Sequence, residues 1–148
     1  IEYAVERPSE PAQVLFEDRL LPLCSPDFKM QHIQSLEALS QAPLIHLDAR
    51  ETNWTSWPNW FAVQGFNGEL ASRHRVNNYT IALQLARDGM GVVVGWKGLV
   101  DPLLRDGRVV PVTACEIDAP GKLYVIPSSE KPKPETLTVS NWMLKQNK

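Results

Sequence analysis

The chain has 148 residues, of which 43% are hydrophobic and 22% are charged, and its formal net charge at pH 7 is −2. This length and composition are those of a globular domain with a hydrophobic core. The net negative charge argues against a domain that grips a nucleic-acid backbone by itself, because such domains carry a clustered basic face. The tight basic cluster Arg73–Arg75 is typical of a solvated strand or loop.

Cys24 and Cys115 form neither a CxxC pair nor a framework of disulfides. A chain of this length does not need a disulfide, so a reducing cytoplasm is the expected location. No apolar run approaches the ~18 residues that span a bilayer. The chain opens with "IEYAV" rather than with Met, and no signal peptide is visible, so we expect a piece of a longer protein.

The first half opens with extended segments. In chain order we expect a strand, a loop, an extended apolar run and two short helices at 1–5, 7–13, 14–26, 27–31 and 35–41. Pro22 forbids a helix interior in the apolar run. Ser35 can cap the second short helix.

A strand, a short turn and a helix then recur three times. The strands are expected at 43–47, 69–76 and 91–95, and the helices at 55–64, 79–88 and 99–106. Pro58 is compatible with the first turn of its helix, whereas Pro102 should shorten the third helix. This alternation is the pattern of a parallel α/β sheet.

The last part of the chain has a different pattern. Residues 108–112 form a strand with a proline, which indicates an edge or crossover segment. Another strand is expected at 122–128, followed by an amphipathic helix at 135–146. The expected core contacts of this helix are Leu137, Trp142 and Leu144.

The second helix of the repeated unit has distinctive ends. Asn77 or Asn78 can act as its N-cap, and Thr80 places a hydroxyl in the first turn. Gly89 is placed to end the helix in the left-handed conformation, and Gly91 lets the chain return to the sheet.

Ligands of open parallel sheets bind outside the carboxyl ends of the strands. The strand-to-helix joints His46–Asn53, Asn77–Thr80 and Gly95–Lys97 would meet at that edge. Open N–H groups at a helix start favour a small anion, especially a carboxylate. The alternative is that these residues are ordinary helix caps.

The succession of motifs resembles a known family. It runs "LPLCSP", "PLIHLD", "W-x-x-W" before a glycine, "NNYTIALQLARDGMGVVVGWKGLV", "GRVVPV", and "LYVIP" before a terminal "NWMLK". In this order the motifs resemble the effector-binding domain of LysR-type transcriptional regulators. The resemblance is greatest to the branch of the glycine-cleavage and β-lactamase-induction regulators.

The resemblance implies a periplasmic-binding-protein type II-like α/β fold of two subdomains joined by crossover strands, with an inducer in the cleft. It implies that 1–15 is the tail of subdomain I and that 16–112 is subdomain II with both crossover strands. Residues 113–148 would return to subdomain I and end in the C-terminal helix. Subdomain I would be incomplete in this chain, and the N-terminal helix-turn-helix would lie outside it.

The resemblance also implies which residues face the inducer. Subdomain II would supply Asn77, Asn78, Tyr79, Thr80, Gly95 and Trp96, and subdomain I would supply Glu2 and Tyr124. We add His46 from its place at a strand-to-helix joint. Ser25 and Pro26 would mark the hinge. No cofactor or metal is expected.

The implied partners are a small-molecule effector and further copies of the chain, as a dimer or tetramer. DNA would be bound only through the missing N-terminal domain, RNA polymerase is a further candidate partner, and no membrane is involved. The helix with Trp57 and Trp60 and the terminal helix are candidate dimer surfaces, with a core role as the alternative for the tryptophans.

Two other classes of protein remain open. A solute-binding protein of a transporter shares the implied fold. A Cys-dependent enzyme would have Cys24, His46 and Asp48 as nucleophile, base and orienting residue. The sequence has no Gly-x-Ser-x-Gly elbow, and an apolar strand is the usual place of an inert thiol, so we expect no enzyme.

Overall fold

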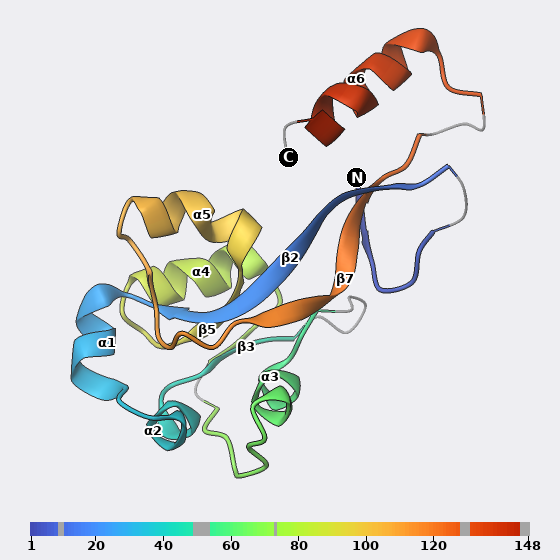
Figure 1. The fold of residues 1–148 in the computed structure, drawn as a ribbon. Helices are drawn as coiled ribbons and strands as arrows, with labels where there is room; N and C mark the ends of the chain where they lie inside the picture. Colours follow the sequence, from blue (N-terminus) through green and yellow to red (C-terminus); the bar gives the residue numbers. More distant parts are fainter. Residues whose placement is uncertain (9–10, 49–53, 73, 128–130, 146–148) are drawn as a thin grey trace. The chain divides into compact units, whose positions relative to one another are not determined.

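The computed structural model describes residues 1–8, 11–48, 54–72, 74–127 and 131–145 (Figure 1). The chain divides into two compact units. Unit 1 consists of Ile1–Asp18 and Asp118–Lys148, and unit 2 consists of Arg19–Ile117. Strands β2 (Gln13–Cys24) and β7 (Ile117–Val125) contribute residues to both units.

Unit 1 contains an antiparallel strand pair and the last helix. Strand β1 (Glu2–Ala4) pairs with β7, with Glu2 opposite Tyr124. The Gly121 N–H donates to the Tyr3 hydroxyl at 2.9 Å, which anchors the pair. Helix α6 (Pro134–Lys145) follows β7 in the chain.

The strands of unit 2 form a mixed arrangement. Strand β2 pairs antiparallel with β5 (Val93–Trp96) and with β6 (Val110–Pro111). Strand β3 (Ile45–Leu47) pairs in parallel with β4 (His74–Val76), and a parallel bridge from Leu44 to Val92 links β3 to the start of β5. Strands β3, β4 and β5 therefore run in one direction, as the repeated unit predicts.

Five helices surround these strands within the described part of unit 2. They are α1 (Pro26–His32), α2 (Leu36–Gln41), α3 (Trp57–Val63), α4 (Tyr79–Arg87) and α5 (Lys97–Arg105). Helices α4 and α5 lie on one side of the strands, and α2 and α3 lie on the other (Figure 1).

The core beneath α4 and α5 is aliphatic. It is built from Leu21, Leu23, Ile45, Ala82, Ala86, Val93, Val100 and Val109. Ala82 and Ala86 are four residues apart and face the strands, and their small size lets the helix approach closely. The apolar stripe of the second helix and the valine strand thus pack together as the sequence predicts.

The core beneath α3 is aromatic. Trp57, Trp60 and Phe61 are 2%, 0% and 1% exposed, and the Trp57 indole N–H donates to the Ile45 carbonyl at 3.0 Å. These tryptophans therefore belong to the core, which is the alternative that the sequence left open, and their side chains are not available to a dimer surface. Pro58 lies in the first turn of α3, as predicted.

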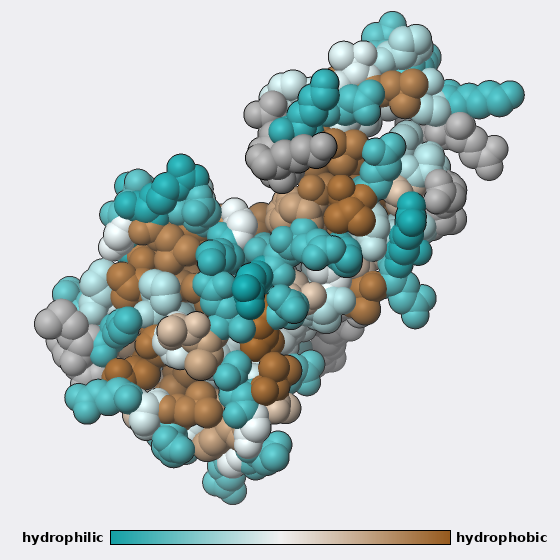
Figure 2. Space-filling view, in the orientation of Figure 1, coloured by the Kyte–Doolittle hydropathy of each residue, from teal (hydrophilic) through white to brown (hydrophobic). Residues whose placement is uncertain are grey.

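Several element boundaries differ from the expectation. Helix α5 begins at Lys97 and continues through Pro102, so this proline does not shorten it. Among the described residues of the segment 69–76, only the three residues of β4 form a strand. In α6, Leu137 and Trp142 are 44% and 60% exposed and are not core residues of the described structure. Figure 2 shows apolar residues on the surface of both units.

Candidate functional site

The carboxyl ends of the parallel strands meet through three aromatic rings. Trp54 follows β3, Tyr79 opens α4 after β4, and Trp96 ends β5. The ring centroid of Trp54 lies 4.8 Å from that of Tyr79 and 4.3 Å from that of Trp96. Tyr79 and Trp96 meet edge to face at 5.6 Å. Aromatic residues that follow or end the three parallel strands are therefore in contact at one edge.

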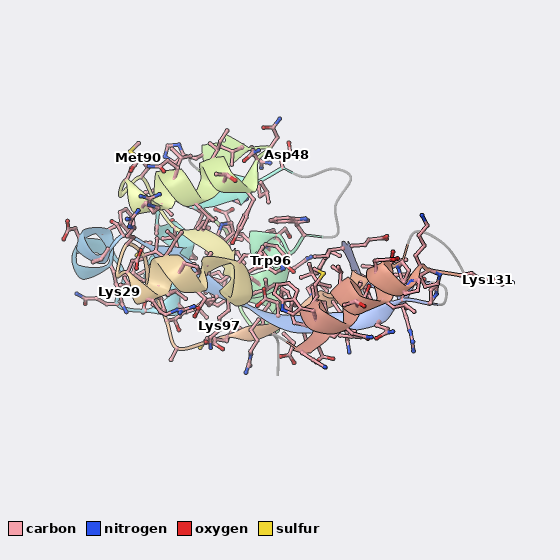
Figure 3. All side chains as sticks on the ribbon, turned by 90° about the horizontal axis from the view of Figure 1, so that it is seen from above. Lys29, Asp48, Met90, Trp96, Lys97 and Lys131 are labelled. Carbon is pink, nitrogen blue, oxygen red and sulfur yellow. The ribbon has the colours of Figure 1, made fainter. Side chains whose placement is uncertain are left out.

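Backbone hydrogen bonds hold this edge together. The Trp96 N–H donates to the Tyr79 hydroxyl at 3.0 Å, which fixes the end of β5 against the start of α4. The Asp48 N–H donates to the Val76 carbonyl at 2.7 Å, which joins the ends of β3 and β4. Figure 3 labels Asp48, which directly follows β3, and Trp96, which is the last residue of β5. We call this region the strand-end site.

A small cavity lies within the strand-end site. It has a volume of about 30 Å³, and His46, Thr55, Ser56, Trp57 and Trp96 line it together with residues of β3 and β5. This volume has room for a single water molecule. Hydroxyl, imidazole and indole groups thus meet in one place, with apolar walls around them.

The start of α4 is closed by its own cap. The Asn78 side-chain oxygen accepts hydrogen bonds from the Thr80 N–H at 2.9 Å and the Ile81 N–H at 3.2 Å. Those N–H groups, which the sequence suggested as donors to an anion, are engaged by Asn78. The exposed side chains of Asn77, Asn78 and Thr80 surround this helix start.

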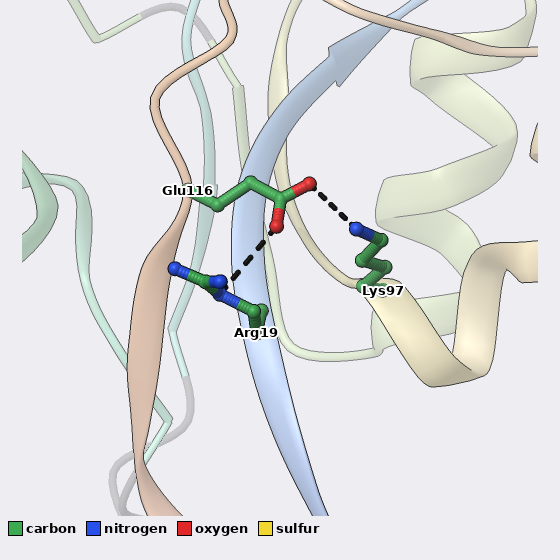
Figure 4. Close-up of polar contacts among 3 residues, drawn as sticks. All are labelled: Arg19, Lys97 and Glu116. Carbon is green, nitrogen blue, oxygen red and sulfur yellow. Dashed lines mark hydrogen bonds and ion pairs between the residues drawn. The ribbon is translucent and has the colours of Figure 1, made fainter.

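The start of α5 has no side-chain cap, since its N-cap residue is Trp96. Lys97 in the first turn pairs with Glu116 at 2.8 Å, and Arg19 reaches the other oxygen of Glu116 at 3.4 Å (Figure 4). Glu116 thus bridges two cations beside the strand-end site. These exposed pairs contribute little to stability, but they fix the direction of the Lys97 side chain.

His46 is half-buried at the end of β3, and its Nε2 lies 3.5 Å from the Ala71 carbonyl oxygen. Burial lowers the pKa of its imidazole below the ordinary value of 6.5, and the positive charge of Arg75 adds to this effect. A lowered pKa favours the neutral ring at pH 7, which can accept as well as donate a hydrogen bond.

The other predicted site residues lie elsewhere in the two units. Tyr124 is buried and Glu2 is exposed, and they face each other across β1 and β7 in unit 1. The Ser25 hydroxyl caps α1 by accepting from the Phe28 N–H at 3.3 Å, and Pro26 is the first residue of that helix. Gly95 is buried inside β5, where a Cβ would lie 2.3 Å from Leu23 Cδ1.

Sequence reasoning missed three residues of the strand-end site. Trp54, Thr55 and Ser56 lie beyond the joint His46–Asn53, whose residues 49–53 fall outside the described structure. Trp54 lies three residues before Trp57, the first residue of α3, and no local pattern in the sequence signals its ring contacts with Tyr79 and Trp96.

The structure shows Cys24 as a buried thiol. Cys24 is 0% exposed, and burial raises its pKa to about 11. A thiol with so high a pKa holds almost no thiolate at neutral pH. Among the described residues, no group of three or more His, Cys, Asp or Glu side chains could hold a metal ion, and no helix is long and apolar enough to cross a membrane.

The fold agrees with comparisons to known proteins. The family described as the LysR substrate binding domain matches residues 3–147. The chain therefore belongs to this family, the effector-binding domain of LysR-type transcriptional regulators. Its fold is the periplasmic-binding-protein type II-like α/β fold, as predicted.

Individual relatives support the same assignment. The chain is 26% identical over 145 residues to the HTH-type transcriptional regulator DsdC of Escherichia coli (strain K12), covering 90% of this chain and 45% of DsdC. It thus spans less than half of that relative. The family consists of transcriptional regulators rather than enzymes.

Solved structures show the same fold. The effector domain of AmpR from Pseudomonas aeruginosa is similar with a TM-score of 0.73 and 25% identity, over 92% of this chain and 64% of that one. The AmpR effector binding domain from Citrobacter freundii has a TM-score of 0.78 and 23% identity, over 97% of this chain and 71% of that one.

Proposed function

We propose that the strand-end site of unit 2 is part of the effector-binding site of a DNA-binding regulator. The observation that carries the proposal is the contact of Trp54, Tyr79 and Trp96 at the carboxyl ends of three parallel strands. Ligands of α/β sheets bind at such ends. The rings form an apolar wall, and polar side chains surround it.

The proposed ligand is a small molecule with a carboxylate. Asn77, Asn78 and Thr80 are exposed at the start of α4 and carry amide and hydroxyl donors. Lys97, which pairs with Glu116, is a cation whose partner a ligand carboxylate can replace. His46 adds a ring that can donate or accept. Gly95, which precedes Trp96 in β5, would contribute only through its backbone, since a Cβ there would point to Leu23.

The remaining predicted contact and hinge residues complete the proposal. By family membership, Glu2 and Tyr124 would contact the same effector, and Ser25 and Pro26 would act at the hinge. Residues 1–15 and 113–148 would belong to subdomain I, and 16–112 to subdomain II with its crossover strands. The compact units support a two-part division, with their borders after Asp18 and after Ile117.

The test of the site uses a panel of amino, hydroxy and keto carboxylates, screened by the rise in melting temperature and then titrated by calorimetry. Thr80→Val removes the hydroxyl at nearly constant shape. We expect it to cost roughly 1–3 kcal/mol of binding free energy, with an unchanged melting temperature of the free protein. Thr138→Val in α6 is the matched control.

Two results would contradict the site. One is an unchanged affinity in Thr80→Val, which would leave this helix start as a plain cap. The other is a lower melting temperature of free Thr80→Val with an unchanged affinity for the carboxylate. The Trp54 and Trp96 fluorescence gives an independent readout, since a ligand against these rings should change their emission.

We further propose that the complete protein regulates transcription in the cytoplasm, binds DNA through an N-terminal helix-turn-helix and assembles as a dimer or tetramer, with RNA polymerase as a further partner. The family match supports this. Sequencing the codons upstream of Ile1 tests it. A secretory signal there, in place of a helix-turn-helix and linker helix, would contradict the regulator. It would favour the solute-binding protein of a transporter.

The proposed branch is that of the glycine-cleavage and β-lactamase-induction regulators. Its support is the ordered succession of motifs through "NNYTIALQLARDGMGVVVGW". A tree of regulator sequences that placed this chain firmly in another branch would contradict the assignment.

We propose no catalysis for this chain. The supporting observation is the buried Cys24 thiol with its raised pKa. Iodoacetamide at pH 8 should alkylate the exposed Cys115 and spare Cys24 in the native protein. Rapid alkylation of Cys24 would contradict this proposal and would favour a Cys-dependent enzyme.

A further inference from the structure

A second cavity of unit 2 lies on the α3 side of β3 and β4. Its volume is about 610 Å³, within the range of small-molecule sites. His46 borders both this cavity and the strand-end site, whereas its other lining residues differ from those of that site. We call it the α3 pocket.

The apolar wall of the α3 pocket is held rigidly. Phe66 stands 5.1 Å from Phe61, measured between ring centroids, and its backbone N–H donates to the Phe61 carbonyl at 3.0 Å. The ring also lies against Gly68, where a Cβ would come within 2.6 Å of Phe66 Cζ. Ala62 and Leu70 extend this wall. A flat apolar group can therefore pack against a fixed aromatic surface.

The polar side of the α3 pocket comes from neighbouring strands. His46 of β3 lies opposite Arg75 of β4 in the parallel register, so both side chains project to the same face. Both line the cavity, and none of its described lining residues is acidic. The pocket thus combines a guanidinium and an imidazole with an apolar wall, which is the chemistry that a carboxylate on a flat body requires.

We propose that the α3 pocket is a second ligand site, which binds a small monocarboxylate with a flat apolar body. Arg75 pairs with the carboxylate, His46 donates a second hydrogen bond to it, and Phe66 packs against the body of the ligand. This site shares His46 with the effector site proposed above, but its other residues differ, and the proposal does not depend on that site.

The test uses phenylacetate as the probe and phenylacetamide as its uncharged counterpart. Binding is followed by NMR titration of the intact chain, with the Ala62 methyl group and the Phe66 ring as reporters. We expect phenylacetate to shift these signals and phenylacetamide to bind at least about 10-fold more weakly, since a charge-assisted hydrogen bond contributes roughly 1.5–3 kcal/mol.

Substitutions in the α3 pocket test which residues contact the bound phenylacetate. Arg75→Gln should weaken phenylacetate binding by about 10-fold or more, whereas the matched variant Arg105→Gln, on the exposed side of α5, should leave it unchanged. Gly68→Ala displaces the Phe66 ring without touching a charge and should also weaken binding. Thermal melts show that each variant is folded.

Three outcomes would overturn the proposal. They are equal affinity for phenylacetate and phenylacetamide, unchanged binding in folded Arg75→Gln, and shifts at Trp54 and Thr55 without shifts at Ala62. The last outcome would place the probe in the strand-end site, so failure of the α3 pocket is distinguishable from failure of the effector site.

Discussion

Gly91 is a residue whose backbone tolerates no side chain. Its φ is +155°, and a Cβ would lie 2.0 Å from the Pro43 carbonyl oxygen, which accepts a hydrogen bond from the Val92 N–H at 3.0 Å. The close approach joins the start of β3 to the start of β5. This is the role that the sequence predicts for a glycine between a helix and a buried strand.

We expect Gly91→Ala to destabilise the protein by about 3 kcal/mol or more, because both the backbone angle and the carbonyl contact must change. Gly107→Ala is the matched control. It also has a positive φ, of +66°, but nothing lies within 4 Å of the added Cβ, and it should cost only about 1 kcal/mol. Urea denaturation measures both. Equal costs would show that the carbonyl contact is unimportant.

His46 gives a pH dependence whose sign follows from its environment. Burial and Arg75 lower its pKa in the folded state, so the unfolded chain binds more protons when the pH falls below about 6.5. Stability should therefore decline as the pH falls through this value, and the decline should stop below the folded pKa.

The measurement compares urea midpoints between pH 5 and 8 for the native sequence and His46→Gln. The native protein should lose more stability than the variant as the pH falls. Parallel curves for the two proteins would contradict a lowered pKa of His46. Phenylacetate in the α3 pocket should reduce the difference, because a carboxylate favours the imidazolium form.

Among elements, helix α4 shows how a cap can be read from sequence. The pair Asn77 and Asn78 predicts an N-cap, and the structure selects Asn78, whose oxygen accepts from the Thr80 and Ile81 N–H groups. The helix ends before Gly89, whose φ is +73°. Both ends are local features, so sequence sufficed to place them.

The two asparagines provide a prediction. Asn78→Ala should destabilise the protein by about 1 kcal/mol through loss of the cap, whereas Asn77→Ala should change stability by less than about 0.5 kcal/mol, as for an ordinary surface position. Thermal and urea denaturation of the pair measure this difference. A larger loss of stability in Asn77→Ala than in Asn78→Ala would indicate that Asn77 is the helix cap.

Elements that depend on distant contacts were harder to predict. Pro102 removes one N–H from α5, yet the helix continues because Val100 is fully buried and Leu103 and Leu104 pack against the core. A strand is expected over 69–76, but residues 69–72 join no strand, and they contain no β-branched or aromatic residue that favours one. Likewise, Trp54 reaches the strand-end site through ring contacts that no local pattern encodes.

For the whole molecule, the apolar surface of unit 1 predicts association. Val139 and Trp142 on α6 are 57% and 60% exposed, and Ile1 and Val5 are 68% and 45% exposed. Exposed apolar surface of this kind favours contact with another chain. We expect the 148-residue chain to form dimers or larger species as its concentration rises.

Light scattering and sedimentation measure this association. The double variant Val139→Lys and Trp142→Lys should shift the chain towards the monomer with little change in melting temperature. Met90→Lys is the control, because Met90 is 47% exposed in unit 2 (Figure 3). A monodisperse monomer of the native sequence at high concentration would contradict the expectation.

The division of the chain also has a consequence for its synthesis on the ribosome. Unit 2 is one continuous segment, whereas unit 1 needs residues from both before Arg19 and after Ile117. At about 5–20 residues per second, the nascent β1 waits roughly 6–24 s for its partner β7 to be translated. Unit 2 can fold during this delay. Within residues 1–148, unit 2 should therefore fold before unit 1 closes.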